Sequence, residues 1–564
     1  MSISRLFHTL RWLPARQLAA LVLQRVQPVF ERPERFAARR APADPGVRWS
    51  LDPRMAPTGP HDPERLRAGQ FTFLNRTEDL GWPPRWDDVT VPRLWLYNLH
   101  YFEFLGSLPY QSGRELVLDW IASHPLARGH AGWEPYPTSL RLFSWCGWLF
   151  GVHRTQADED RELRALVWPS IWLQVEWLAR HLETHLRGNH LLENAAALAF
   201  CGACFGGPGD AWMRRGLAWL DRELPEQILA DGVHFERSPM YHARVVHVLG
   251  MLETTRAPEL VERVAELLGR TRTALARLCH PDGEIALLND AAFGIAPEPG
   301  DLLDESPPEG VFALRDAGYY GARAAGHYIV CDAAPIGPDY LLGHAHGDLL
   351  SFELSLAGRR VVVDAGVHGY DGDPLRAWCR STRAHNTVEI GGEDQCEFWG
   401  VFRVARRGRP RDVVWTTPSD GFRLSAWHDG YERLPGRPRH AREFRWYRDG
   451  VLLVRDRVSA SRPVAAVSRL HLHPECVIEE VSVRRARIRH PGGVFRVAFD
   501  GDGELAVEAS TYCPEFGRRV DNRALVFTPR DRVTDFGFCI AHGGGDVSYT
   551  LASGAQVQAR RYPW

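Results

Sequence analysis

The sequence predicts an α+β multidomain fold in which an N-terminal α/α toroid precedes a C-terminal antiparallel β-sandwich. Its 564 residues exceed what one ordinary hydrophobic core holds. Apolar residues recur at helical spacing through the first half, with short connections between the runs. From about residue 310 the apolar runs become short and β-branched, with turn residues between them. Because helices come first and strands second, we expect separate domains.

The N-terminal part is expected to hold an amphipathic helix followed by an extended wrapping segment, together residues 1–70. The apolar run 18–23 lies between Arg16 and Arg25, is too short to span a membrane, and is not followed closely by a small-x-small cleavage site. No signal peptide is therefore expected in the given sequence. The predicted location is cytoplasmic, or periplasmic or secreted if a leader precedes this sequence.

Residues 71–305 are predicted to form the toroid, because helical hairpins of similar size follow one another, a pattern of an α/α toroid or superhelix. The expected helices cover residues 94–105, 115–121, 138–152, 163–186, 190–204, 212–224, 240–255 and 260–278. Residues 306–564 are predicted to form the β-sandwich. Its clearest strand patterns are at 311–314, 326–331, 349–356, 361–363, 413–415, 450–456, 464–467 and 525–528.

Composition narrows the function classes. A formal net charge of -2 and a pI near 6.9 give no signal for nucleic acid or a membrane as partner. All 68 basic residues are arginine, which excludes Schiff-base and lysine-base chemistry. The ten cysteines are scattered, and the Cys201–Cys204 pair lies in an alanine-rich helical run, so buried thiols are expected instead of disulfides. No organic cofactor is expected.

A histidine-rich stretch predicts a metal site. His346, Asp364 and His385 each stand near the end of a predicted strand, where a sheet would gather two imidazoles and a carboxylate. This ligand set suits one divalent ion, Zn²⁺ first and Mn²⁺ second. His344 is two residues from His346, and a loop would let one histidine face the metal and the other a cleft. The alternative is a solvated strand edge with a turn-forming aspartate.

Two polar stretches of the helical half offer further candidates. Asn189 is expected to cap a helix, with His190 beside it and Glu193 three residues on, where it would orient the imidazole. Pro239 is typical of a helix start, so Tyr241 falls in the first turn, where the helix-end potential would lower the pKa of its phenol. The alternatives are a capped helix with a surface histidine, and a tyrosine that packs one face.

Five motifs together resemble the heparinase II/III family of polysaccharide lyases. They are Arg187-Gly-Asn-His-Leu-Leu-Glu-Asn, Glu236-Arg-Ser-Pro-Met-Tyr-His, Gly343-His-Ala-His-Gly-Asp-Leu-Leu-Ser-Phe, Val363-Asp-Ala-Gly and Arg383-Ala-His-Asn-Thr-Val. They stand in the family's order, and the resemblance covers residues 90–420 closely. It implies a toroid followed by antiparallel sheets with a cleft between them, a structural metal at His346, Asp364 and His385, and an acidic, uronate-containing polysaccharide as substrate.

The lyase chemistry implied by the resemblance explains the residue types. A lyase removes the uronate C5 proton and expels the 4-linked oxygen; Asn189 and His190 would hold the carboxylate and spread its developing charge. Tyr241 or His344 would be the base, and Tyr241 would also serve as the acid. The predicted substrate contacts are Tyr136, Arg141, Glu193, Arg237, Asn289, Arg380 and Arg383.

The expected substrates are glycosaminoglycans such as heparan sulfate, hyaluronan or chondroitin sulfate. An alginate or bacterial exopolysaccharide lyase is the first alternative. A glycoside hydrolase would need two carboxylates, which Glu193, Glu236 and Asp290 could supply. A glycan-binding protein without activity would keep the aromatic residues but not the Asn-His, Tyr and His set. The sequence predicts no oligomeric state.

Overall fold

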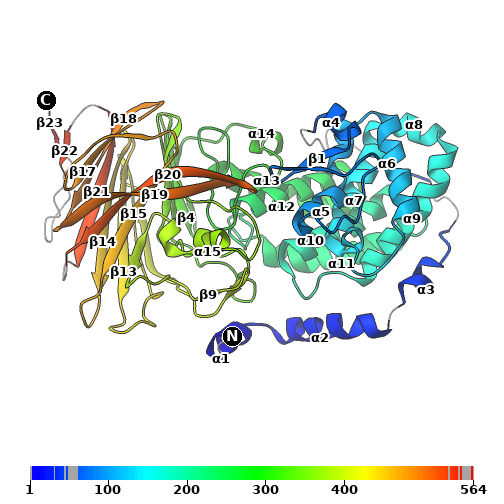
Figure 1. Ribbon diagram of the computed structural model, residues 1–564, viewed down its shortest axis with the longest axis horizontal. Helices are drawn as coiled ribbons and strands as arrows, with labels where there is room; N and C mark the ends of the chain where they lie inside the picture. Colours follow the sequence, from blue (N-terminus) through cyan, green and yellow to red (C-terminus); the bar gives the residue numbers. More distant parts are fainter. Residues whose placement is uncertain are drawn as a thin grey trace. The chain divides into compact units, whose positions relative to one another are not determined.

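The computed structural model describes residues 3–30, 32–42, 46–48, 61–530, 534–543, 546–548 and 560–562 (Figure 1). Its contacts divide the chain into two compact units. The helical unit comprises residues 14–228 and 245–269, and the sheet unit comprises residues 1–13, 229–244 and 270–564. Residues 270–305 therefore group with the sheets, so this division differs from the one predicted at residue 305. Each unit is described by itself.

The helical unit has the α/α toroid architecture that the sequence predicts. Its helices are α2 (Ala15–Phe30), α3 (Pro33–Ala37), α4 (Pro63–Arg67), α5 (Arg93–Tyr101), η2 (Glu103–Ser107), α6 (Tyr110–Ser123), η3 (Ala131–Trp133), α7 (Pro135–Gly147), η4 (Trp148–Val152), α8 (Arg154–Glu159), α9 (Arg161–Arg180), α10 (Gly188–Cys204) and α11 (Gly209–Gln227), and the division between units runs through α12 (Pro239–Thr254) and α13 (Pro258–Arg277). A two-stranded sheet pairs β1 (Gln70–Phe73) with β2 (Arg76–Asp79).

Helices α10 and α11 are packed closely because glycines line their contact. A Cβ on Gly202 would lie 2.5 Å from the backbone nitrogen of Met213, and one on Gly216 would lie 2.5 Å from that of Ala199. Any larger residue would force the two helices apart. The small residues of α10, which the sequence shows as an alanine-rich run, thus fix the position of the polar residues at its start.

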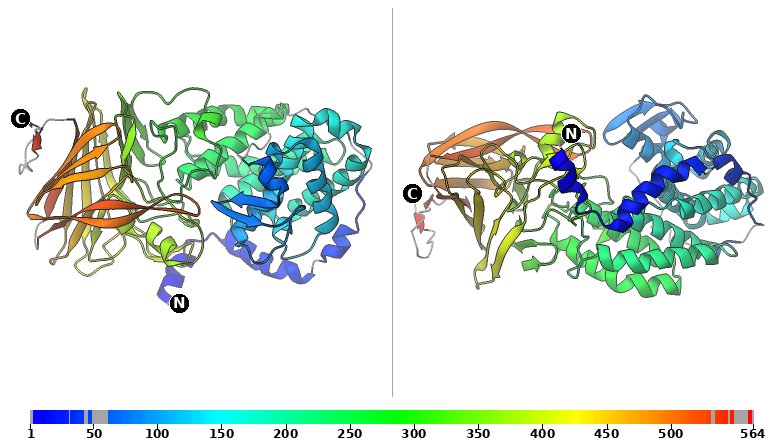
Figure 2. Two further views of the ribbon diagram at one scale, coloured as in Figure 1. Left: turned by 45° about the horizontal axis from the view of Figure 1, so that its top comes forward. Right: turned by 90° about the horizontal axis from the view of Figure 1, so that it is seen from below.

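The sheet unit is an antiparallel β-sandwich, as predicted. One sheet has the order β11-β12-β13-β14-β21-β18-β17-β16; the other has the order β19-β20-β15-β7-β6-β5-β4-β3, with β8 paired to β15. Buried residues of both sheets, such as Phe352, Leu470, Phe444 and Phe538, form one shared core. The long β19–β20 hairpin, orange to red, is plain in Figures 1 and 2.

The strand bounds are β3 (Gly310–Leu314), β4 (Tyr319–Ala324), β5 (His327–Asp332), β6 (Phe352–Leu356), β7 (Arg359–Val362), β8 (Val388–Ile390), β9 (Phe398–Trp399), β10 (Arg403–Val404), β11 (Pro410–Thr416), β12 (Gly421–His428), β13 (Arg439–Tyr447), β14 (Val451–Ser459), β15 (Ala466–Leu472), β16 (Val477–Val481), β17 (Arg485–His490), β18 (Gly493–Asp500), β19 (Gly503–Glu515), β20 (Arg518–Pro529), β21 (Asp535–His542), β22 (Asp546–Ser548) and β23 (Arg560–Tyr562). The unit also holds the helices α1 (Ile3–Leu10), α14 (Pro299–Leu302), α15 (Pro374–Arg380) and η5 (Thr382–Ala384).

The remaining sequence expectations concern the N-terminal part and the cysteines. The extended segment predicted for residues 31–70 falls partly on 31, 43–45 and 49–60, outside the described residues. Among the residues described, no helix is long and apolar enough to cross a membrane. All ten cysteines are free thiols, nine of them buried, as the sequence predicts.

Candidate active site

Tyr241 stands in the first turn of α12, as predicted from Pro239. The Ser238 hydroxyl accepts a hydrogen bond from the Tyr241 backbone N–H (3.3 Å) and donates one to the Asp290 carbonyl (2.5 Å), which ties the start of the helix to the sheet unit. The Tyr241 ring packs on His344, with 4.1 Å between ring centroids. Its hydroxyl lies 2.7 Å from the hydroxyl of Tyr370.

Burial decides the ionisation of Tyr241. Loss of solvent, then the neighbouring Tyr370 and the negative charges of Asp290 and Glu236, raise the pKa of the phenol well above its usual value of 10.0. The lowered pKa expected from the helix terminus is therefore corrected, because desolvation and nearby carboxylates outweigh that weak potential. Tyr241 is a neutral phenol at neutral pH, which suits a proton donor better than a base.

Asp290 is the buried centre of this site. Its Oδ2 accepts from His344 Nδ1 at 2.9 Å and its Oδ1 from His346 Nε2 at 2.8 Å. Arg376, from α15, donates to both carboxylate oxygens. Burial alone would raise the Asp290 pKa, but Arg376 and the two histidines hold it well below its usual range. The carboxylate is thus charged and accepts only.

A charged Asp290 fixes the tautomers of both histidines. Nδ1 of His344 and Nε2 of His346 must carry hydrogen to donate to it. In a neutral ring, this leaves the lone pair on His344 Nε2, which lies 3.4 Å from Glu236 Oε2. Glu236 is placed to stabilise the imidazolium that forms when His344 takes a proton. The loop that carries both histidines thereby gives them different tasks.

The three predicted metal ligands come together in the sheet unit. One ligand atom from each of His346, Asp364 and His385 lies within 4.8 Å of the other two, and all three side chains are fully buried. Asp364 Oδ2 is 2.7 Å from His385 Nδ1, whereas His346 Nδ1 and His385 Nε2 are buried without a hydrogen-bond partner. Burial lowers the pKa of His346 to about 3, so its ring is neutral. Two neutral imidazole nitrogens without partners beside a carboxylate fit a divalent ion.

In the helical unit, His190 is held between an aromatic ring and a carboxylate. Its ring stacks on Tyr136 at 4.2 Å between centroids, and its Nδ1 lies 3.1 Å from Glu183 Oε1. Glu193, predicted to orient His190, instead accepts a hydrogen bond from the Tyr136 hydroxyl at 2.9 Å. Tyr136 and Glu183 thus position the imidazole, and Glu193 acts through Tyr136.

Asn189 is the second residue of α10, not its N-cap. The helix begins at Gly188, and Arg187 occupies the cap position with a φ of 65° and no side-chain cap. The Asn189 side chain is 2% exposed. Its predicted capping role is corrected, because the chain turns into the helix one residue earlier, on the Arg187-Gly188 pair.

The predicted substrate contacts include several residues that the structure buries. Arg141 donates to Gln174 Oε1 (2.9 Å) and the His100 carbonyl (3.3 Å), and Arg237 and Arg380 donate to backbone carbonyls. Asn289 donates to the Arg237 carbonyl and accepts from the His346 N–H. These four side chains are at most 8% exposed, so their role is corrected from holding a polymer to holding loops. Arg383 is exposed.

Sequence reasoning missed three members of these groups. Tyr370 and Arg376 lie between Asp364 and His385 in a segment without periodicity, and Glu183 lies in a short loop before α10. The only local signal was their position close to recognised motifs. Their roles come from the contacts with Tyr241, Asp290 and His190, which only the folded chain forms.

Two family models match the chain. Residues 119–294 match the heparinase II/III N-terminus, and residues 306–557 match the heparinase II/III-like C-terminal model. The chain is 24% identical over 444 residues to a heparin-sulfate lyase of Pedobacter heparinus, covering 70% of this chain and 65% of that protein. It is 25% identical over 435 residues to a heparin-sulfate lyase of Bacteroides stercoris, covering 62% of each. The matched region thus spans less than two thirds of these relatives.

Solved structures share the fold. A crystal structure of heparinase III aligns with a TM-score of 0.70 and 15% identity, covering 99% of both chains. A heparan sulfate lyase mutant from Pedobacter heparinus aligns with a TM-score of 0.61 and 20% identity, covering 97% of this chain and 94% of the other. The order of toroid and sandwich is therefore that of these structures.

Proposed function

Because the chain belongs to the heparinase II/III-like family, we propose that it is a polysaccharide lyase that cleaves uronate-containing glycosaminoglycans by β-elimination. Heparan sulfate is the first candidate substrate, since the relatives are heparin-sulfate lyases; hyaluronan and chondroitin sulfate follow. The observation that carries the proposal is a neutral Tyr241 packed on His344, whose tautomer is set by Asp290. The partner is thus an acidic polysaccharide.

The elimination breaks the C5–H and C4–O bonds of the uronate and forms the C4=C5 double bond. We assign proton removal at C5 to His344 Nε2, because the buried phenol of Tyr241 is a poor base. Glu236, 3.4 Å away, stabilises the imidazolium. Tyr241 donates the proton that the departing 4-linked oxygen needs. Since the two rings are in contact, one proton can return from His344 to Tyr241 for the next cycle.

Proton removal next to a carboxylate is difficult because negative charge develops on that group. We assign Asn189 and His190 to hold the uronate carboxylate, as amide and imidazole donors. Glu183 and the Tyr136 ring keep the His190 imidazole in position. Arg383 is the exposed arginine among the predicted contacts, and we assign it to sulfate or carboxylate groups of the polymer.

A divalent ion, Zn²⁺ or secondarily Mn²⁺, is proposed at His346, Asp364 and His385. When bound it would supply positive charge and cross-link the loop before β6, the end of β7 and the segment after η5. The Asp290 contact to His346 Nε2 would then act as an outer-shell bond that orients the ligand. The ion's proposed role is structural; the proton transfers are assigned to Tyr241 and His344.

The hydrolase alternative is less well supported. A hydrolase needs one carboxyl group that is protonated to act as an acid. Asp290 is held ionised by Arg376 and is fully buried, and Glu193 is engaged by Tyr136. Alginate and bacterial exopolysaccharide remain alternative substrates, because they carry the same uronate chemistry.

A product assay on a panel of polymers tests the proposal. Heparan sulfate, heparin, hyaluronan, chondroitin sulfate and alginate are incubated with the protein, and both ultraviolet absorbance and new reducing ends are followed. Elimination raises both signals together, because only elimination creates a conjugated 4,5-unsaturated uronate. New reducing ends without absorbance would establish a hydrolase. Polymer binding with neither signal on any polymer would establish a glycan-binding protein.

A further inference from the structure

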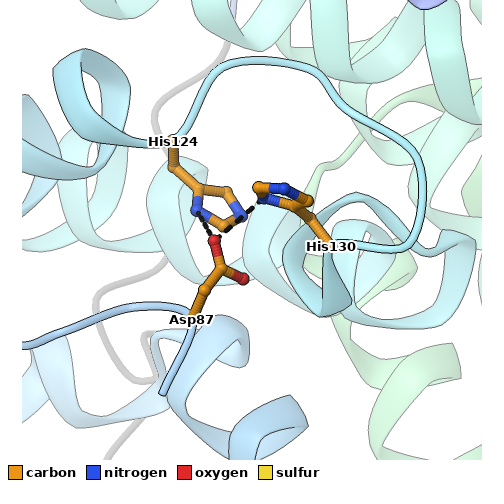
Figure 3. A group of neighbouring side chains, drawn as sticks. All are labelled: Asp87, His124 and His130. Carbon is orange, nitrogen blue, oxygen red and sulfur yellow. Dashed lines mark ion pairs between the residues drawn. The ribbon is translucent and has the colours of Figure 1, made fainter. Parts of the chain in front are cut away.

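A second histidine-aspartate cluster lies in the helical unit, apart from the residues assigned above. Asp87 comes from the loop between β2 and α5, His124 ends α6, and His130 precedes η3 (Figure 3). His124 Nδ1 is 3.1 Å and His130 Nδ1 is 2.9 Å from the same oxygen, Asp87 Oδ2. Three segments, separated in sequence, thus aim two imidazoles and a carboxylate at one point.

The distances match the edges of a metal coordination shell. Zinc bonds to nitrogen and oxygen of about 2.0–2.2 Å place neighbouring ligand atoms about 3.3 Å apart in a tetrahedron. The two nitrogen–oxygen separations are within a few tenths of that value, and all three ligand atoms lie within 4.8 Å of one another. An ion needs only a small outward shift of the carboxylate to enter.

The hydrogen-bond pattern agrees with a ligand role. The buried Nδ1 of His130 forms no hydrogen bond of acceptable geometry, although Asp87 Oδ2 is close. The neighbouring Asp88 accepts the bonds that fix the loop, from the Thr90 backbone and hydroxyl and from Arg85. Asp87 is left to face the two histidines. Burial lowers the pKa of His124, so its ring is neutral and able to bind a metal.

The surroundings hold the rings rigidly but leave one side open. A Cβ on Gly132 would lie 2.8 Å from His124 Nε2, so only glycine lets the η3 backbone lie against this ring. The Trp120 ring packs on His124 at 5.0 Å. Asp87 and His130 remain 39% and 37% exposed, which leaves room for a water ligand. A rigid inner ligand with two outer ligands accessible to solvent allows the ion to enter.

We propose that Asp87, His124 and His130 form a Zn²⁺ site that ties the loop before α5 to the end of α6 and the start of η3. Two imidazoles and one carboxylate with an open fourth position form a donor set that zinc accepts. The proposal is independent of the lyase assignment, since it rests on a separate set of residues.

Zinc content of the full chain tests the site. The protein is stripped with a chelator, reloaded with Zn²⁺ alone and desalted, and bound zinc is measured for the parent, Asp87→Asn, His130→Gln and Asp88→Asn. We expect Asp87→Asn and His130→Gln each to lose one equivalent, and Asp88→Asn, the matched neighbour, to lose none. Because Asp87 and His130 are partly exposed, both variants are expected to fold, which circular dichroism checks.

Measurements in a His385→Ala background separate this site from the one in the sheet unit. There, Co²⁺ should give one visible absorption spectrum and Zn²⁺ should raise the melting temperature, and adding His130→Gln should abolish both effects. Competition with a chelating dye should show zinc bound at least about a hundredfold more weakly without His130, since even outer-shell losses cost 10–100-fold. If this background does not fold, Co²⁺ titration of the parent against His130→Gln gives the same comparison. Equal zinc content and equal Co²⁺ spectra with and without His130 would overturn the proposal and leave an ion pair only.

Discussion

Replacing Asp290 by asparagine is expected to cost both stability and activity. The substitution keeps the shape of the side chain but removes the charge that pairs with Arg376, which is 3% exposed. Breaking a buried ion pair costs about 3–5 kcal/mol. Arg376 also donates to the carbonyls of Gly343 (3.3 Å) and Val401 (3.1 Å), which partly satisfy it. We therefore expect a loss near the lower end, about 3 kcal/mol in the free energy of unfolding.

The expected loss of activity follows from the tautomers. An amide has one acceptor oxygen, so it cannot accept from both His344 and His346 as the carboxylate does. If His344 moves its hydrogen to Nε2, it no longer has a lone pair for the C5 proton. In the serine-protease triad, the corresponding Asp-to-Asn change lowers kcat about 10⁴-fold through the wrong tautomer. We expect a fall of at least about a thousandfold here.

The assay compares Asp290→Asn with Asp282→Asn, which breaks another Asp–Arg pair of the sheet unit, to Arg360 (2.6 Å). Urea unfolding gives stability, and the rate of unsaturated product formation gives activity, both at a temperature where each variant is folded. The control should lose stability, about 1–2 kcal/mol after allowing for its exposed third, yet keep its turnover. Turnover of Asp290→Asn within threefold of the parent, or a stability loss below about 1 kcal/mol, would refute the reasoning.

Four further outcomes are expected. Tyr241→Phe should remain folded, losing about 1 kcal/mol with its hydroxyl bond, but form almost no unsaturated product, whereas Tyr370→Phe, which loses the same bond, should keep most turnover; equal rates for both would make Tyr241 a packing residue. Asn189→Ala should lower turnover by about a hundredfold or more with polymer cleavage as readout, and unchanged turnover would remove it from the carboxylate site. His385→Ala should lose one metal equivalent by mass spectrometry, and unchanged content would remove the metal from the sheet unit. Burial alone would raise the Asp282 pKa, but Arg360 lowers it to about 2, so its stabilisation is complete above about pH 4 and is lost as the pH falls towards 2; the stability difference between the parent and Asp282→Asn, measured by urea unfolding, should shrink over that range, and a constant difference would contradict the assignment.

The elements of the fold were largely predictable because periodicity is a local property. The helix expected at residues 190–204 is α10 (Gly188–Cys204), and the helix expected at 260–278 is α13 (Pro258–Arg277). The alternation at 349–356 marked β6 (Phe352–Leu356), although the strand begins three residues later. Boundaries moved where Gly and Pro, not apolar residues, start the element.

The roles of single polar residues were less predictable because they depend on distant partners. Arg141 and Arg380 read as solvent-facing cations in the sequence, but α7 and α15 bury them against carbonyls brought by other segments. The Tyr241 pKa was expected to fall from its helix position, which is local, and rises through burial and carboxylates, which are not. A polar residue's neighbours along the chain do not reveal its desolvation.

Asp290 shows why the site's logic appears only in three dimensions. In the sequence it follows Asn289 in a weak motif, 54 and 56 residues before the histidines it binds. In the structure its two oxygens are divided between His344, assigned to proton transfer, and His346, assigned to the metal. A change at either histidine must therefore alter the hydrogen bond that the other receives. If the proposed ion leaves, His346 can turn, and the carboxylate that fixes the His344 tautomer turns with it. Metal loss would then lower activity through the position of a base, even though the ion itself takes no part in the proton transfers.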